Sequence, residues 1–136
     1  MAANPSRPPA RPLSPHLTIW RWGPHMAVSI LHRATGMALT FAGLGLLTWW
    51  LVAIAGDPSG FATFTKVATH PIGVIVLIGL TWSFFQHLLS GIRHLIMDTG
   101  SAFELQTNKT LAIATIVGSL LLTAALWAWL LFGTRA

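Results

Sequence analysis

The sequence predicts an all-α membrane protein with three transmembrane helices. Of its 136 residues, 54% are hydrophobic and only 8% are charged, a balance that is far too apolar for an ordinary soluble domain. Three stretches without Asp, Glu, Lys or Arg lie between Arg33 and Asp57, between Lys66 and Arg93, and between Lys109 and Arg135. Each is longer than the about 20 residues that a helix needs to cross a bilayer. A small helical protein with three membrane spans is therefore expected.

The composition also limits the cofactors and partners. The sequence contains no cysteine, so an iron–sulfur cluster would have to be held by another subunit. The net charge is +5, but the few basic residues border apolar segments, so membrane topology explains them better than nucleic-acid binding does. We expect membrane lipid and other membrane subunits around this chain, and no nucleic acid.

Residues 1–23 are expected to form a cytoplasmic N-terminal arm. Most of the eight prolines lie in this arm or directly after it, which disfavours a helix. The arm lacks the apolar core of a signal peptide and the amphipathic helix of an organelle transit peptide, so a bacterial protein is expected. A disordered tail is the alternative, but the apolar residues Ile19, Trp20 and Trp22 favour contact with a membrane interface or a partner.

Prolines and turn residues set the limits of the first two spans. Pro24 suits the first turn of a helix, which predicts transmembrane helix 1 over residues 24–55. A turn-rich segment follows and predicts an outer loop over 56–70, with room for a short surface helix. Pro71 then begins transmembrane helix 2, which is expected over 71–97.

The last part of the chain is expected to contain a cytoplasmic loop over 98–109 and transmembrane helix 3 over 110–132. This third helix is rich in small residues, which favour close packing, and no polar site is predicted on it.

The distribution of Lys and Arg predicts the orientation. Six of the eight Lys and Arg residues lie on the side of the membrane that also holds the N-terminus. An excess of positive charge marks the cytoplasmic side of a membrane protein. The six residues are Arg7, Arg11, Arg21, Arg33, Arg93 and Lys109, whereas Lys66 and Arg135 lie on the opposite side. We therefore expect the N-terminus in the cytoplasm and the chain in a bacterial inner membrane.

A polar stripe interrupts the end of the second predicted span. His87 lies in the charge-free run, roughly 10 Å deeper than His94 and on nearly the same helical face, with Ser90 and Gly91 between them. An ionisable residue at this depth indicates a functional site. Haem iron is the obvious candidate, because imidazole is a common axial ligand and glycine leaves room for a flat macrocycle. The alternative is a histidine that only bonds to a neighbouring helix.

A second polar cluster opens the first predicted span. Ser29, His32 and Arg33 are spaced i, i+3 and i+4, so they share one face of the helix. Taken alone, Arg33 would be a snorkelling charge that fixes topology. Ser29 and His32 beside it favour a polar pocket instead. The predicted topology places this cluster and the polar end of the second span in the same half of the bilayer, so one compound site is expected.

These motifs resemble the cytochrome b anchor family of succinate dehydrogenase. The resemblance rests on three segments in the right order, Arg11–Leu17, Ser29–Gly36 and His87–Asp98. It implies a heterodimeric helical bundle with a second anchor subunit, holding haem b and forming a ubiquinone site with an iron–sulfur subunit. The sequence departs from the family pattern at Gln86, where an aromatic residue is familiar, and at Trp20, where a tyrosine is usual.

The resemblance implies a role for each polar residue. His87 would be the axial ligand of the haem iron, with the second axial ligand supplied by another subunit. The haem propionate region would contain His32, Arg33, Arg93 and His94. Ser29 and Arg33 would border the quinone pocket.

The expected function is that of a non-flavin anchor subunit of succinate:ubiquinone oxidoreductase, which is not catalytic alone. Its partners would be a flavoprotein subunit, an iron–sulfur subunit and the second anchor. Two alternatives remain open at this point. One is a small non-redox helix bundle whose polar residues join helices, and the other is the anchor of a fumarate reductase.

Overall fold

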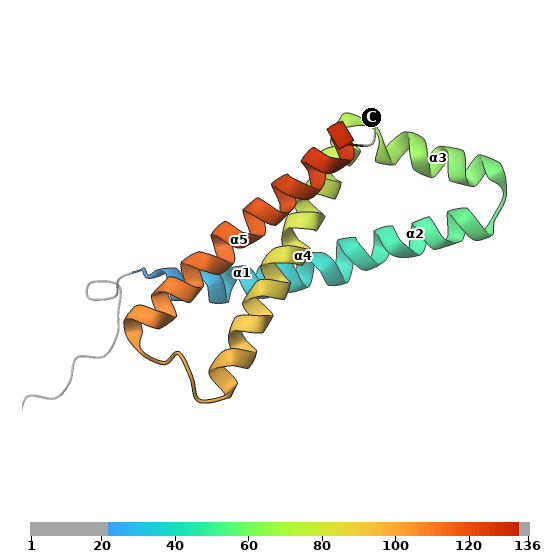
Figure 1. The fold of residues 1–136 in the computed structure, drawn as a ribbon. Coiled ribbons are helices and arrows are strands. Elements are labelled where there is room, and N and C mark those ends of the chain that lie inside the picture. The colour runs from blue at the N-terminus through green and yellow to red at the C-terminus, as the bar shows by residue number, and fades with distance from the viewer. Residues whose placement is uncertain (1–21, 134–136) are drawn as a thin grey trace, which may run out of the picture.

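The computed structural model describes residues 22–133, so nearly all of the predicted N-terminal arm, including Arg11–Leu17, lies outside the described residues. The described chain is helical and contains no strand. Three helical spans are long and apolar enough to cross a membrane, which confirms the predicted fold class: Pro24–Ala55, Pro71–Asp98 and Leu105–Phe132. Figure 1 shows the elements in order: α1 (Pro24–Ala38), a π-helical segment (Leu39–Gly43), α2 (Leu44–Ala55), α3 (Pro58–Ala68), α4 (Pro71–Asp98) and α5 (Leu105–Phe132).

Local sequence explains where the helices begin. Proline occupies the first turn of α1, α3 and α4, where its missing N–H is not needed. The Asp57 side chain caps α3 by accepting a hydrogen bond from the Ser59 N–H at 2.8 Å. At the start of α4, His70 Nδ1 accepts from the Ile72 N–H at 3.3 Å.

The first span is not a uniform α-helix. The π-helical segment Leu39–Gly43 separates α1 from α2, and such segments commonly bend a helix. Figure 1 shows α2 leading away from the crossing of α1, α4 and α5. Within residues 22–133, α2 has close backbone contacts with α3 and with the π-helical segment, but none with α4 or α5.

Helix α3 fills most of the segment that was expected to be an outer loop. It turns back along α2, and the rings of Trp49 and Phe64 meet edge to face at a centroid distance of 5.1 Å. Helix α5 begins at Leu105 rather than at the expected residue 110, so the preceding connection is shorter than expected. Gly100 in this connection has a φ of 82°, which glycine adopts without strain.

The interface between α4 and α5 contains polar side chains, although no polar site was predicted on the third span. Ser119 donates a 2.7 Å hydrogen bond to Gln86 Oε1, and both residues are fully buried. Thr115 and Thr123 of α5 are also buried. Their hydroxyls donate hydrogen bonds to backbone carbonyls of their own helix. These buried hydroxyls therefore keep a hydrogen-bond partner although they lie between two helices. These small polar residues are the kind that let transmembrane helices approach closely.

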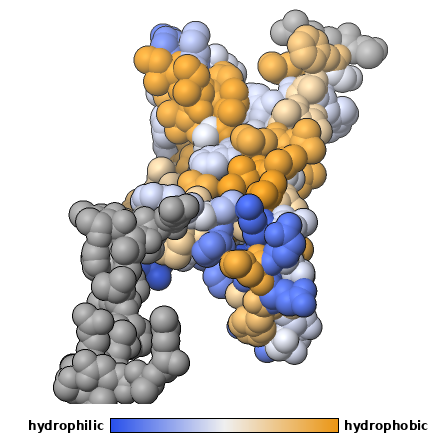
Figure 2. All heavy atoms as spheres, turned by 90° about the vertical axis from the view of Figure 1, so that its left-hand side faces the viewer, coloured by the Kyte–Doolittle hydropathy of each residue, from blue (hydrophilic) through white to orange (hydrophobic). Residues whose placement is uncertain are grey.

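Few apolar side chains are buried inside the described chain. The buried hydrophobic residues are Val28, Ala53 and Ala112, whereas most large apolar side chains are exposed. Figure 2 views the molecule from the end at which α1 begins, and hydrophilic side chains gather in its lower part, below a largely apolar region. An apolar surface of this extent is typical of a chain that lies in a lipid bilayer.

Candidate functional site

Three histidines from two helices meet at the crossing of α1 and α4. The rings of His32 and His87 stack with a centroid distance of 4.0 Å and an interplanar angle of 8°. The ring of His94, two turns along α4 from His87, lies 5.0 Å from that of His32. The structure thus brings the three histidines together and places the His32 ring at the depth of His87.

Hydrogen bonding fixes the orientation of His87. Its Nδ1 lies 3.1 Å from the carbonyl oxygen of His32, and because a carbonyl can only accept, Nδ1 carries the ring proton. Thr35 Oγ1 lies 3.4 Å from the same nitrogen and donates its own proton to the Leu31 carbonyl at 2.7 Å. Nε2 of His87 is therefore left with a free lone pair, the form in which imidazole binds a metal.

Gly36 allows α1 to approach the His87 ring. A Cβ atom at this position would lie 2.9 Å from Cε1 of His87, which is closer than real Cβ contacts. Gly91, which was expected to make room for a macrocycle, faces His32, and a Cβ there would meet His32 Cε1 at an ordinary 3.9 Å. No separate roles were predicted for Thr35 and Gly36, although their position directly after His32 and Arg33 was a usable signal.

His94 is oriented by its own helix. Its Nδ1 lies 2.7 Å from the Ser90 carbonyl, so this nitrogen also carries the proton and Nε2 is available as an acceptor. The side chain is exposed at the cytoplasmic end expected for α4. In contrast, His32 Nδ1 is buried and has no hydrogen-bond partner among the described residues. A buried polar atom in this state indicates that water or another group completes the site.

The structure does not bring Arg93 to the histidines. Its side chain is only 6% exposed and turns toward α5, where Nη2 donates to Asn108 Oδ1 at 2.6 Å. Arg93 therefore joins the end of α4 to the start of α5, and its expected place beside the haem propionates stays a prediction.

Ser29 and Arg33 lie on α1 at the same end as the histidine cluster. Ser29 is half-buried and Arg33 is exposed, so the guanidinium is available to a partner or a ligand outside the described helices. Their spacing of four residues places both on one helical face. The structure therefore leaves open the role in a quinone pocket that was predicted for them.

The residues present fit a haem with one axial ligand from this chain. His87 offers an oriented Nε2, and it is held by second-sphere contacts of the kind that metal-bound histidines usually make. Among residues 22–133, no group of three or more His, Asp or Glu side chains could enclose a free metal ion.

Fold and site together define a small membrane protein that presents an oriented histidine within its spans. Residues 7–126 match the succinate dehydrogenase/fumarate reductase transmembrane subunit family, and the chain belongs to this family. The resemblance inferred from the motifs is thereby confirmed.

Curated relatives agree with the family assignment. The chain is 43% identical over 112 residues to the succinate dehydrogenase cytochrome b556 subunit of Paracoccus denitrificans, which covers 82% of this chain and 85% of the relative. It is 39% identical to the subunit of the same name from Rickettsia conorii, over 86% of this chain and 90% of the relative. It is 35% identical to the mitochondrial succinate dehydrogenase cytochrome b560 subunit of Sus scrofa, over 84% of this chain and 70% of the relative.

Proposed function

We propose that this chain is a membrane-anchor subunit of succinate:ubiquinone oxidoreductase and that it holds haem b. The orientation of His87 is the observation that carries this proposal, because a transmembrane imidazole with a fixed Nδ1–H and a free Nε2 is prepared to bind iron. Family membership gives the class of complex, and the relatives' names include cytochrome b.

When bound, haem b would supply a one-electron redox centre within the membrane. His87 Nε2 would be the ligand from this chain. The His32 ring stacks face to face on that of His87, so we assign His32 to the propionate region and not to the iron. Another subunit would supply the second ligand.

The surrounding donors suit carboxylates. His32, His94 and the exposed Arg33 lie near the same end of the helices, where they would bind the haem propionates. Arg93 contributes through its bond to Asn108, which holds the end of α4 against α5. Its guanidinium would have to leave Asn108 in order to reach a propionate directly.

Ser29 and Arg33 form this chain's part of the quinone pocket. Reduction of a quinone places negative charge on its oxygens before they are protonated, and a hydroxyl and a guanidinium stabilise that charge by donating hydrogen bonds. The planar fork of Arg33 also orients the oxygen that it binds.

Partner subunits would hold the remaining redox centres, and they would also bury part of the apolar helix surface. Because the chain has no cysteine, iron–sulfur clusters belong to another subunit, and a flavoprotein subunit would oxidise succinate. A second anchor would complete the haem site and cover apolar helix surface. The excess of Lys and Arg on the N-terminal side supports a cytoplasmic N-terminus in a bacterial inner membrane.

Purification of the assembled complex tests this function. The expected result is a low-spin b haem together with succinate oxidation that is coupled to reduction of ubiquinone. A chain that assembles without haem and without these subunits would support the non-redox helix bundle instead. Faster fumarate reduction by a low-potential quinol would support the fumarate reductase alternative, which the family description also covers.

A further inference from the structure

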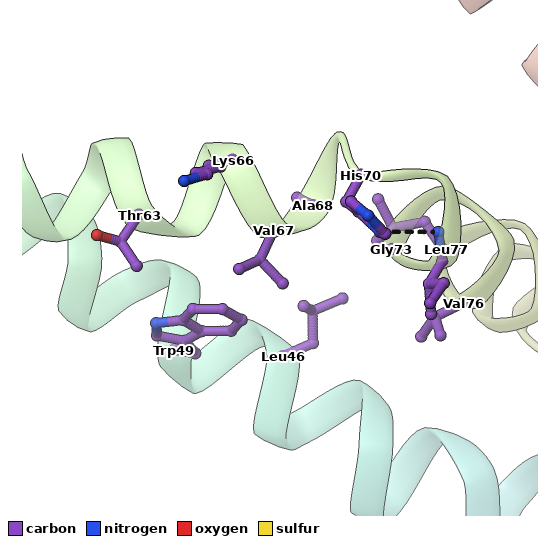
Figure 3. Close-up of a pocket in the computed structure, with 11 residues that line it drawn as sticks. Leu46, Trp49, Thr63, Lys66, Val67, Ala68, His70, Gly73, Val76 and Leu77 are labelled. Carbon is purple, nitrogen blue, oxygen red and sulfur yellow. Dashed lines mark hydrogen bonds between the residues drawn. The ribbon is translucent and has the colours of Figure 1, made fainter.

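A cavity lies at the opposite end of the bundle from the histidines. It has a volume of about 620 Å³ and lies between α2, α3 and the first turns of α4. Figure 3 shows Leu46 and Trp49 of α2 facing Val67 of α3, and the first turns of α4 close the third side with Val76 and Leu77. The walls are almost wholly apolar, and the volume is in the range of ligand sites.

The backbone keeps this groove open. Helix α2 diverges after the π-helical segment Leu39–Gly43, and α3 bridges the gap that results. At one end the Trp49 and Phe64 rings meet edge to face. At the other end α4 approaches α3 so closely that a Cβ atom at Gly73 would collide with the carbonyl oxygen of Val67. The groove is therefore defined by the chain's own helix contacts.

The titratable residues of the groove are basic, and Thr63 adds a hydroxyl. Lys66 and His70 line it, and none of the three acidic residues of the sequence does. His70 Nδ1 accepts a hydrogen bond from the Ile72 N–H, so the neutral ring carries its proton on Nε2 and can donate. Lys66 is exposed in the last turn of α3. An apolar groove with two donors at its rim matches a ligand that has a long apolar tail and an anionic head.

We propose that this groove binds an anionic phospholipid, with an acyl chain between α2 and α4 and the phosphate held by Lys66 and His70. Helix α3 is short, joins two transmembrane spans and carries Lys66 in its last turn, so this lysine lies where a span meets the membrane surface. A basic side chain near the headgroups contributes to the binding of anionic lipid, and its four-carbon stem packs along apolar surface. The lipid would also tie α2 to α4, which do not otherwise pack together.

Lipid competition in the assembled complex tests this site. The complex is exchanged into phosphatidylcholine vesicles that contain a minor fraction of phosphatidylglycerol, and the retained lipids are measured by native mass spectrometry. We expect the unmodified complex to retain phosphatidylglycerol selectively. Lys66→Gln should weaken this retention about fivefold, which is the effect of losing one basic contact to an anionic membrane lipid.

Two further variants keep the result interpretable. Lys109→Gln removes an exposed lysine at the start of α5, far along the chain from the groove, and should leave retention unchanged. Val76→Trp places an indole in the groove and should reduce retention of phosphatidylglycerol. If this variant does not assemble, the retention measured for the Lys66→Gln complex alone tests the proposal. Equal retention by the Lys66→Gln and unmodified complexes would overturn the proposal. So would density for a partner helix filling the groove in a structure of the complex.

Discussion

At the scale of single residues, hydrogen bonding distinguishes His87 from its neighbours. Depth in the membrane does not distinguish His87 from His32, because the two rings stack at a centroid distance of 4.0 Å. The difference is that His87 Nδ1 is bound to a carbonyl of α1, whereas His32 Nδ1 is buried without a partner among the described residues. The sequence placed the two polar clusters in the same half of the bilayer, because the predicted topology sets where each helix begins and ends. It could not predict the tautomers of the histidines, which depend on contacts between helices.

Substitution of Gly36 tests the support of His87. In Gly36→Ala the new methyl would lie 2.9 Å from His87 Cε1, so the imidazole or α1 must shift. We expect a lower haem content or a changed haem midpoint potential in the assembled complex, measured by optical redox titration. The matched control is Gly45→Ala, where an added Cβ meets nothing within 4 Å. An unchanged potential at full haem content would show that Gly36 does not hold the ligand in place.

Ser29 and Arg33 test the quinone pocket. Ser29→Ala and Arg33→Lys should each lower ubiquinone reduction by about tenfold or more, since a hydrogen bond to a charged group contributes about 1.5–3 kcal/mol. Electron transfer from succinate to a soluble artificial acceptor should be unaffected, because it does not use the pocket. If Arg33 only fixes topology, Arg33→Lys will be harmless. Equal loss of both activities would indicate misassembly.

At the scale of helices, the spans were predictable because length and apolar character decide them. The polar α4–α5 interface was not predicted, since a serine in an apolar run gives no sign of the side chain that it faces. Gln86, which departs from the family pattern, is the residue that Ser119 meets. The π-helical segment Leu39–Gly43 was also missed, because its residues have no proline or other local signal that distinguishes them from α-helix.

The Gln86–Ser119 bond should stabilise the packing of α4 on α5. Ser119→Ala leaves the buried Gln86 amide without this partner and should destabilise the complex by about 1 kcal/mol, as measured by thermal unfolding in detergent. Adding Gln86→Leu to Ser119→Ala should recover part of the loss, because the unpaired amide is then removed. If the single and double variants unfold identically, the two side chains are not coupled.

The cap of α3 predicts a pH dependence outside the spans. Hydrogen bonds from the Ser59 hydroxyl and N–H lower the pKa of Asp57 from its ordinary value. Because folding lowers the pKa of Asp57, the cap stabilises α3 fully at pH values above the ordinary pKa of an aspartate. This stabilisation is lost as the pH falls through the lowered pKa of Asp57 in the folded chain. The protection factor of the amides in the first turn of α3, which is the intrinsic exchange rate at each pH divided by the measured rate, should therefore fall at acidic pH. Asp57→Ala should show the low protection factor at every pH, and a protection factor that does not change with pH in the unmodified chain would refute this role.

At the scale of the whole molecule, the small buried core implies dependence on partners. Within residues 22–133, only three apolar side chains are buried, and the proposed haem and quinone residues lie at a surface that other subunits would complete. Composition alone predicted a membrane protein, but a single sequence could not show which helix faces meet lipid and which meet another chain.

Expression of the chain alone tests this dependence. We expect aggregation or rapid degradation in mild detergent, and recovery when the flavoprotein, iron–sulfur and second anchor subunits are expressed with it. The measurement is size-exclusion chromatography with subunit identification. A monodisperse, long-lived monomer would contradict the proposed shared site.

The haem spectrum of His87→Ala in the assembled complex tests the central claim most directly. We predict loss or conversion of the low-spin b haem signal, whereas His94→Ala should keep the low-spin signal and shift its midpoint potential. Low-temperature electron paramagnetic resonance distinguishes these outcomes, provided that subunit stoichiometry is unchanged. An unaltered bis-histidine signal in His87→Ala would contradict the account and assign the iron to another histidine.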